Sequence, residues 1–454
     1  MFKKALLMSS ALAVVSIASP AFASDKDARI EALEAQMQVM FEEIQRLKAE
    51  RTVEKQEQVA LKQEIKTLRE TTENNNAQIA AIEPAAGQSS GDFSEFRKGD
   101  FSLKPFGRIQ LDAASFNDDE RDHPNGAEFR RLRLGAKGDL PGDFGYKIQI
   151  GYDGDRTDIE DAFITYDGID NTQLKLGNHK PAFGLVEHSS SNDNTFIERG
   201  SANDVFFEGR AIGLSATTYS DRWRLNAGVF NDDPGTSSAD DEAFSVGSRV
   251  TGVPVKTDNG YLHIGGFVDY RSPDQEGESF EFDADAENSL QDADSVSVTI
   301  NNADSAIVAG LEAAAIWGPL SLQGEYFRAK VDTDSGPEPT FDSAYIEGSW
   351  IITGESRPYK TSSATIGRPK PDNPFNTSNG DWGAFEVGAR YSTVDLNDAG
   401  FTGGEMDTVT LGANWYLNNY LRFSGNYIFA DTDENAVTPN DEPEIMLVRA
   451  QAAF

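Results

Sequence analysis

The sequence predicts an all-β fold, a 16-stranded antiparallel transmembrane β-barrel with an N-terminal α-helical coiled coil. Three observations predict the barrel. Apolar and polar residues alternate with period two from about residue 101 to the end of the chain. The final segment is apolar on one face, carries Arg449 and Gln451 on the other, and ends in the aromatic Phe454. Short and long connections separate the candidate strands. Outer-membrane barrels combine these features, because alternate residues of each strand face lipid and water.

Composition narrows the class of protein. The 454 residues include no cysteine, so disulfides and thiolate metal sites are excluded, and the formal charge of -35 argues against nucleic-acid binding. Beyond the N-terminal segment, no apolar run reaches the roughly 18 residues of a membrane helix. A barrel needs only alternate apolar residues. With four histidines, no nucleophile elbow and no phosphate-binding loop, the sequence predicts no enzyme, no cofactor and no metal site.

The first residues have the pattern of a secretory signal peptide, which we assign to residues 1–23. Lys3 and Lys4 precede an apolar stretch, and Ala21-Phe22-Ala23 is a small-x-small cleavage site. The apolar stretch is too short to cross a bilayer. We therefore expect cleavage before Ser24, with an uncleaved anchor as the alternative.

Residues 24–83 predict a periplasmic coiled coil. A heptad register that starts at Ile30 continues through eight heptads with mainly Ile, Leu and Met at its core positions. Its middle layer, with Arg51, Glu54 and Gln58, is polar and is expected to be the weakest part. A single solvated helix is the alternative, but it would leave the apolar seam in water. Pro84 ends the helix, and residues 84–100 form a linker.

Residues 101–454 form the predicted barrel. In one clear strand, Tyr146, Ile148 and Ile150 alternate with Lys147 and Gln149. An even number of strands places both ends of the barrel chain on the same side of the membrane. The sixteen candidate strands are 103–113, 128–137, 144–153, 159–166, 173–178, 209–219, 222–231, 243–252, 260–271, 305–316, 319–330, 341–353, 382–394, 405–417, 419–431 and 443–454.

The connections between these strands differ in length. We expect short turns at one end of the barrel and long loops at the other, as in outer-membrane proteins. A soluble β-sandwich, the alternative fold, has no reason to sort its connections in this way. The short connections are 139–143, the turn near Asp221, 318–319 and 418–419, and the long ones are 114–126, 232–242, 272–304 and 354–380.

Residues 179–207 are too long for a tight turn, and we expect them to fold inward and narrow the lumen. An external surface loop is the alternative. In the inward arrangement, Lys180, Glu187, His188 and Arg199 are candidates for the constriction. His188 would then make conductance depend on pH, although a solvated histidine is the simpler interpretation.

The strand faces that alternate with the apolar residues predict a basic lumen. Asp112, Asp153 and Asp161 are the corresponding acids. Fixed cations in the wall favour the entry of anions into a pore. The alternative is that these charges face the lumen only because water solvates them there, without any role in selectivity. Arg130 has the parity of a lipid-facing residue, and a charged side chain is unfavourable in lipid. We therefore expect Arg130 to lie at the outer rim of the barrel or at a β-bulge. The basic residues predicted to face the lumen are Lys104, Arg108, Arg131, Arg133, Lys147, Lys175, Arg224, Arg422 and Arg449.

The segment 272–304 is rich in Asp and Glu. Glu281, Asp283, Asp285 and Glu287 alternate along it and offer oxygen ligands for divalent cations that would bridge to lipopolysaccharide. The segment lacks the glycine of a calcium loop at the required place, and a solvated run of charges is the simpler interpretation.

Several stretches resemble the phosphate-selective porin O and P family, across about 101–454. The resemblance implies a sixteen-stranded trimeric outer-membrane channel, an inward-folded third loop, and arginines that guide anions to a lysine-bearing constriction. The stretches are Phe106 to Gln110, Phe129-Arg130-Arg131, Tyr146 to Asp153, Ile159 to Tyr166, Leu174 to Gly177, Phe183-Gly184-Leu185, Ile352 to Glu355 and Leu411 to Tyr416.

The family's functional positions transfer in part. Arg108, Arg130 and Arg131 match arginines of the ladder, Lys147 matches a lumen lysine, and Asp161 matches a constriction aspartate. Two departures concern the family's other basic groups. Segment 272–304 contains no Lys or Arg, and Val186 to Asn192 contains no lysine where the constriction lysines are expected.

The sequence therefore predicts an outer-membrane porin for the passive diffusion of small anions such as phosphate. The expected partners are two further copies in a homotrimer, outer-membrane lipid and lipopolysaccharide, small anions, and peptidoglycan through the coiled coil. The alternative is a general non-selective or weakly cation-selective porin, whose coiled coil tethers the envelope.

Overall fold

The computed structural model describes residues 95–117, 120–121, 123–153, 156–231, 243–273, 279–291 and 293–454, with eight helical positions between Met37 and Lys66. The chain divides into two compact units, Met1–Gly87 and Gln88–Phe454. The signal peptide and the heptad pattern of 24–83 lie outside the described residues apart from those eight positions, so both remain predictions. In the part of the chain described, no helix is long and apolar enough to cross a membrane.

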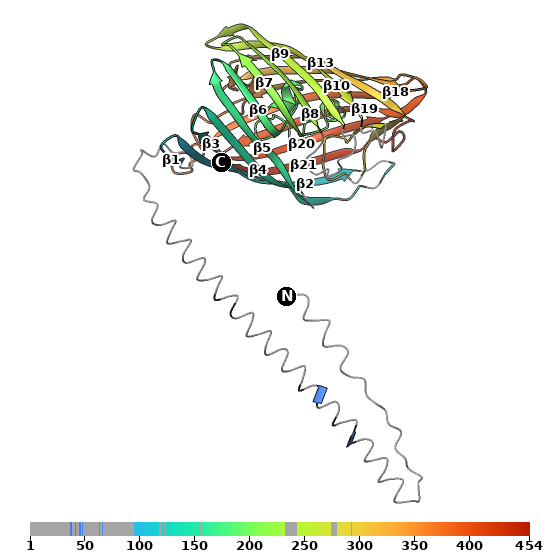
Figure 1. Ribbon diagram of the computed structural model, residues 1–454, viewed down its shortest axis with the longest axis horizontal. Helices are drawn as coiled ribbons and strands as arrows, with labels where there is room; N and C mark the ends of the chain where they lie inside the picture. The colour runs from blue at the N-terminus through green and yellow to red at the C-terminus, as the bar shows by residue number, and fades with distance from the viewer. Residues whose placement is uncertain are drawn as a thin grey trace, which may run out of the picture. The chain divides into compact units, whose positions relative to one another are not determined.

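Sixteen antiparallel strands close into a barrel (Figure 1), which confirms the predicted 16-stranded β-barrel. Closure occurs between the first and last barrel strands, from Arg108 opposite Ala453 to Asn117 opposite Glu444. A short strand, β1 (Phe96–Lys98), pairs with the start of β2. The barrel strands are β2 (Phe101–Asn117), β3 (Gly126–Leu140), β4 (Phe144–Asp153), β5 (Arg156–Ile169), β6 (Thr172–His179), β7 (Ala211–Tyr219), β8 (Trp223–Asn231), β9 (Phe244–Thr257), β10 (Gly260–Ser272), β13 (Ala303–Trp317), β14 (Leu320–Thr333), β15 (Thr340–Ile351), β18 (Ala384–Asp398), β19 (Phe401–Tyr416), β20 (Leu421–Thr432) and β21 (Glu444–Ala453).

The period-two pattern determines which side chains face outward. Large apolar side chains such as Leu134, Ile148, Leu176 and Leu311 are exposed on the outer face, where lipid would cover them. The five tryptophans all lie near the same end of the barrel; four are exposed and Trp415 is half-buried. Tryptophan prefers the boundary between lipid and water. The outer face therefore has the apolar band and aromatic belt of a membrane barrel. The tryptophans are Trp223, Trp317, Trp350, Trp382 and Trp415.

The two ends of the barrel differ, with one exception to the predicted sorting. We call the end with the connections 141–143, 170–171, 220–222 and 318–319 the turn end, and the opposite end the loop end. The predicted long loop 354–380 lies at the turn end, because it follows the twelfth barrel strand. At the loop end, β18 and β19 are joined by two residues, 399–400. The expectation that all long connections share one end is therefore wrong.

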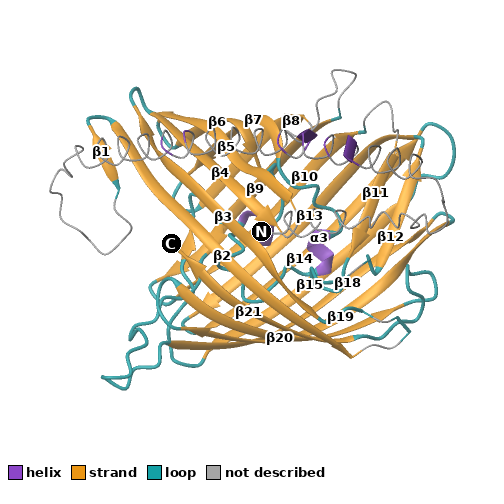
Figure 2. Cartoon of the chain, turned by 90° about the horizontal axis from the view of Figure 1, so that it is seen from below, coloured by secondary structure: helices purple, strands orange, loops and turns teal. Residues whose placement is uncertain are grey.

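Three connections contact inward-facing residues of the barrel wall. The third loop, residues 180–210 between β6 and β7, contains α2 (Leu185–His188) and α3 (Ser201–Asp204), and α3 is labelled within the barrel in Figure 2. A hairpin of β11 (Ser279–Ala284) and β12 (Val296–Asn301) comes from the loop end. The turn-end segment, residues 352–383, contains the hairpin β16 (Tyr359–Lys360) and β17 (Thr365–Ile366).

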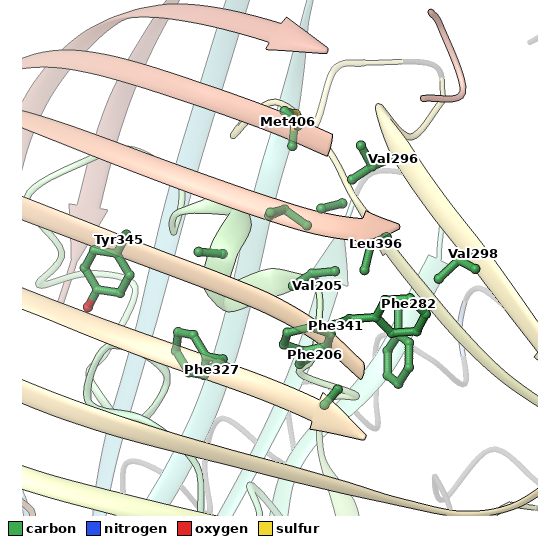
Figure 3. Close-up of a cluster of buried hydrophobic side chains, with 14 of the residues drawn as sticks. Val205, Phe206, Phe282, Val296, Val298, Phe327, Phe341, Tyr345, Leu396 and Met406 are labelled. Atoms are coloured by element: carbon green, nitrogen blue, oxygen red, sulfur yellow. The ribbon is translucent and has the colours of Figure 1, made fainter. Parts of the chain in front are cut away.

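Buried apolar side chains form a cluster inside the barrel (Figure 3). Val205 and Phe206 of the third loop and Phe282 of β11 pack with inward-facing wall residues such as Phe327 and Met406. Burial of these side chains away from water stabilises the inward position of the loop and the hairpin. The polar part of the lumen consequently lies along the wall formed by β2 to β8.

Candidate functional site

A cavity of about 440 Å³, here called the inner cavity, lies between the third loop and β2 to β8. Ten of its lining residues are lysine or arginine and three are aspartate or glutamate. In a protein of formal charge -35 this is a local reversal of sign. The charged lining residues are Arg108, Arg130, Arg131, Arg133, Lys147, Lys175, Lys180, Arg199, Arg210, Arg224, Asp161, Glu187 and Asp204.

The structure brings together eleven of the twelve candidate site residues. Arg108, Arg130, Arg131, Arg133, Lys147, Lys175, Asp161, Lys180, Glu187, His188 and Arg199 all line the inner cavity. Lys104 does not line this cavity. It lies nearer the turn end, opposite Lys137 in the β2–β3 register, and Lys137 in turn lies opposite Lys147.

A β-bulge turns two consecutive arginines into the lumen. The β2–β3 register shifts between Gln110 and Asp112, opposite Arg130. Such a bulge lets two consecutive residues face the same side of the sheet, so Arg130 reaches the lumen although strict alternation assigns it to the lipid face. Arg130 and Arg131 both pair with Glu198 of the third loop, at 3.2 and 3.1 Å. Burial would raise the pKa of Glu198, but Arg130, Arg131 and Arg449 hold it well below its usual range. Glu198 is therefore ionised and neutralises part of the arginine charge.

A second bulge places two consecutive carboxylates in the lumen. The β4–β5 register shifts between Ile148 and Ile150, opposite Glu160 and Asp161. Arg210 bonds both, with 2.5 Å to Glu160 and 2.9 Å to Asp161. A strict period-two pattern assigns Glu160 to the lipid face, so sequence reasoning missed it. Arg210 was also missed: it lies within the candidate strand 209–219, whereas the observed strand β7 begins only at Ala211.

The same two carboxylates bind basic residues of the wall. Arg133 pairs with Glu160, and Lys147 lies 2.5 Å from Asp161. Each of these cations is therefore balanced by a carboxylate of the barrel wall. A cavity with ten basic residues consequently carries a much smaller net charge than its arginines and lysines suggest.

The predicted constriction residues of the third loop mostly bind one another. Glu187 pairs with Lys180 and, at 2.7 Å, with Arg199. Burial, opposed by Glu187, lowers the pKa of Lys180 to about 7. His188 accepts a hydrogen bond from the Phe183 backbone N–H through Nε2, at 3.2 Å. Burial and then the charges of Arg249 and Arg224 lower the pKa of His188 well below its usual value, so it is neutral near pH 7.

Six side chains of the barrel wall and Arg357 of the turn-end segment hold the third loop through its backbone, an arrangement we call the clamp. Between Ser191 and Glu198, seven loop carbonyls accept hydrogen bonds from side chains outside the loop. The clamp consists of Gln110 to Ser191 (3.4 Å), Gln451 to Asn192 (3.2 Å), Arg357 to Asp193 (2.7 Å), Arg422 to Asn194 (2.7 Å), Asn414 to Thr195 (2.7 Å), Arg449 to Ile197 (2.6 Å) and Arg390 to Glu198 (3.1 Å).

The clamp changes the interpretation of two predicted lumen residues. Arg422 and Arg449 face inward, as their parity predicts, but both are buried behind the third loop. Neither lines the inner cavity. Arg449 also forms two hydrogen bonds with Asp112, at 2.7 and 2.6 Å. These arginines position the loop and contribute no surface to the polar pathway.

The turn-end segment meets the wall and the third loop from the other side. Arg357 bonds Glu386 of β18 at 2.9 and 2.8 Å. The hydroxyl of Tyr359 lies 2.7 Å from His263 Nδ1 of β10. Ile366 packs against Leu185 of the third loop. Sequence reasoning placed this segment among the external loops and therefore missed these contacts.

Three basic residues of the inner cavity differ from the others in their lack of a carboxylate partner among the described residues. Arg108, Lys175 and Arg224 form no ion pair with a carboxylate of the described residues. Arg108 donates to the hydroxyl of Ser191, and the ammonium of Lys175 lies 4.7 Å from the centre of the Phe163 ring. No carboxylate of the described residues neutralises these three groups by direct contact.

Comparisons with known proteins agree with this architecture. A family model described as phosphate-selective porin O and P matches residues 104–454. An uncharacterized protein of Caulobacter vibrioides is 28% identical over 351 residues, which cover 74% of this chain and 70% of that protein. Porin O of Pseudomonas aeruginosa is 28% identical over 403 residues, with 78% and 89% covered.

Solved structures share the fold at low identity. OmpT of Vibrio cholerae aligns with a TM-score of 0.53 and 10% identity over 80% of this chain and 100% of its own. An anion-selective porin from Comamonas acidovorans aligns with a TM-score of 0.51 and 15% identity, with 78% and 100% covered. At such identities the likeness concerns the fold.

Proposed function

Because this chain belongs to the phosphate-selective porin O and P family of outer-membrane porins, we propose that its channel admits small anions such as phosphate by passive diffusion. The observation that carries the proposal is the inner cavity, where ten basic residues face three acidic ones. Fixed guanidinium and ammonium groups lower the energy of an anion in the pore and raise that of a cation. Arginine also donates paired hydrogen bonds that suit phosphate and carboxylate oxygens.

Anion preference rests mainly on Arg108, Lys175 and Arg224. The other cations of the cavity wall are balanced in part by Glu160, Asp161 and Glu198. We therefore expect a moderate preference for anions over cations. Strong retention of phosphate would require the lysines and loop arginines that this sequence lacks.

The acidic hairpin at the loop end supports the alternative of a non-selective or weakly cation-selective porin. Asp283 and Asp285 lie on the hairpin β11–β12 with no basic residue in segment 272–304. Acidic groups at a pore mouth attract cations. In the anion channel the basic inner cavity controls the current, whereas in the alternative the acidic hairpin does. The sign of the reversal potential distinguishes the two functions.

The rest of the assembly follows from the family and the sequence. The turn end would face the periplasm, since short turns are periplasmic in such barrels. Three copies would form the trimer, in contact with outer-membrane lipid and lipopolysaccharide. The mature chain would begin at Ser24, and its coiled coil, residues 24–83, would lie in the periplasm and bind peptidoglycan.

The test is the reversal potential of the purified protein in a planar bilayer under a potassium chloride gradient. We expect an anion-selective potential that Arg108→Gln reduces and Arg328→Gln leaves unchanged. Arg328 pairs with Asp342 on the outer face of the barrel and serves as the control. A near-zero or cation-selective potential in the unaltered protein would overturn the proposal.

A further inference from the structure

Arg224 is a buried arginine with unused hydrogen-bond donors. It is 7% exposed, and its side chain lines the inner cavity. Nε and Nη1 have no hydrogen-bond partner among the described residues. The remaining contact is long, 3.4 Å from Nη2 to the hydroxyl of Thr217. A buried charge without a counterion is costly, so this position calls for an anionic ligand.

A second guanidinium lies next to Arg224. In the β8–β9 register Arg224 is opposite Thr251, and Arg249 is opposite Asn226. Arg224 and Arg249 are therefore diagonal neighbours on the inner face, a spacing that long side chains bridge easily. Nη1 of Arg249 is also buried and lacks a partner within the described part of the chain.

The nearby carboxylate is already engaged. Glu312 accepts hydrogen bonds from Arg249 at 2.8 and 3.1 Å, and it also binds His263 Nε2 at 2.8 Å. One carboxylate thus faces two guanidinium groups, which leaves one positive charge and three donor atoms unused. An oxyanion with at least two acceptor oxygens would satisfy these donors, whereas chloride offers no such geometry.

We propose that Arg224, which lines the inner cavity, and its fully buried neighbour Arg249, which is not among the lining residues, form a separate oxyanion subsite on the turn side of that cavity. The inference rests on the proposed function, since the cavity must carry anions to the subsite. Arg224 is the second residue of β8, close to the turn 220–222, whereas Arg108 lies well inside β2. An anion that leaves the region of Arg108 and Ser191 therefore has a second position to occupy before it exits. Channels conduct well when several sites of moderate strength follow one another.

The test uses arsenate, a phosphate analogue that anomalous X-ray scattering locates in crystals of the full protein. We expect an arsenic peak beside Arg224 and Arg249 that is absent in Arg224→Gln and present in Arg222→Gln. Arg222 lies two residues away in the turn, where it donates to backbone oxygens at 3.5 Å, so its replacement removes the same charge. Absence of the peak in the unaltered protein would overturn the subsite, whatever the ion selectivity.

Currents provide the second measurement. We expect inorganic phosphate added at the turn side to block chloride current about 10-fold less strongly in Arg224→Gln, because a charge-assisted hydrogen bond contributes about that factor to affinity. Arg222→Gln should match the unaltered protein. An anion-selective channel in which both variants keep the same phosphate block would refute the subsite and leave the proposed function intact. A non-selective channel with an arsenic peak at Arg224 would support the subsite and refute the proposed anion preference.

Discussion

Arg357 donates a hydrogen bond from Nη1 to the backbone oxygen of Asp193, at 2.7 Å, and so joins the turn-end segment to the third loop. The same side chain bonds Glu386 of the barrel wall. Three parts of the chain that are distant in sequence therefore meet at one guanidinium. The contact explains how a connection from the turn end supports a loop that enters from the loop end.

Replacing Arg357 tests this support. We expect Arg357→Leu to lower stability by roughly 3–5 kcal/mol, because Glu386 becomes a buried charge without its partner. The third loop should also move more, which would appear as excess noise in the open-channel current. Thermal unfolding and single-channel recording measure the two effects.

The double variant Arg357→Leu with Glu386→Gln provides the control, since it removes both charges. Much of the stability should return, whereas the noise should persist because the bond to Asp193 is still missing. Equal and full recovery of both properties would mean that Arg357 acts only through Glu386.

Neutralising a carboxylate of the second bulge should strengthen anion preference. In Glu160→Gln, Arg133 and Arg210 lose a counterion and face the cavity with more of their charge. The reversal potential should shift toward that of a more anion-selective pore. Asp342→Asn, which removes a carboxylate from the outer face, should leave the potential where it was. A shift toward cations in Glu160→Gln would contradict this account of the cavity.

The hairpin β11–β12 should be more stable in its docked position at low pH than at high pH. Burial, then Asp294, Asp204 and Asp283, raise the pKa of Asp285 to about 8. A raised pKa means that folding favours the protonated carboxyl, so its contribution is complete below about pH 4 and is lost as the pH rises through about 8. Hydrogen exchange of residues 279–291 should therefore be slower at pH 5 than at pH 9, after correction for the intrinsic rate.

Asp285→Asn should reduce that pH dependence. Glu338→Gln, in an exposed ion pair of another loop-end connection, should not change it. If the unaltered hairpin exchanges equally at both pH values, the acidic groups do not influence its docking.

Deleting residues 24–83 should leave conductance and ion selectivity unchanged. All residues that line the inner cavity come from the barrel strands and the third loop, so the channel does not require the predicted coiled coil for its charge. A tether would show itself differently, through loss of envelope integrity in cells that carry the deletion. Single-channel recording measures conductance, and sensitivity of the cells to detergent measures envelope integrity. A changed conductance would contradict the claim that the channel functions independently of residues 24–83.

Period two determined the strands well, because lipid and water impose it on every barrel strand. It placed Lys147, Arg133 and Arg449 on the inner face, where they lie. It failed at Glu160, because a bulge lets two consecutive residues face the same way. It also could not distinguish Arg449 from Lys147 in role, since the pattern shows which face a side chain occupies and not which loop covers it.

The inward connections were the least predictable part. The third loop was expected to fold inward, but its partners are residues such as Gln451 and Asn414, hundreds of positions away in sequence. The turn-end segment was assigned to the wrong end because its length was read without counting strands. Tertiary contacts of this kind leave no local pattern, and only the closed barrel brings them together.

The clamp binds carbonyl groups, which every amino acid possesses. Mutations that alter the side chains of Asp193 or Asn194 therefore leave the anchoring hydrogen bonds available. Related pores could exchange the residues of this loop during evolution and acquire new solute preferences at little risk to the scaffold. The same property makes the loop a convenient insertion cassette for engineering nanopores with chosen selectivity.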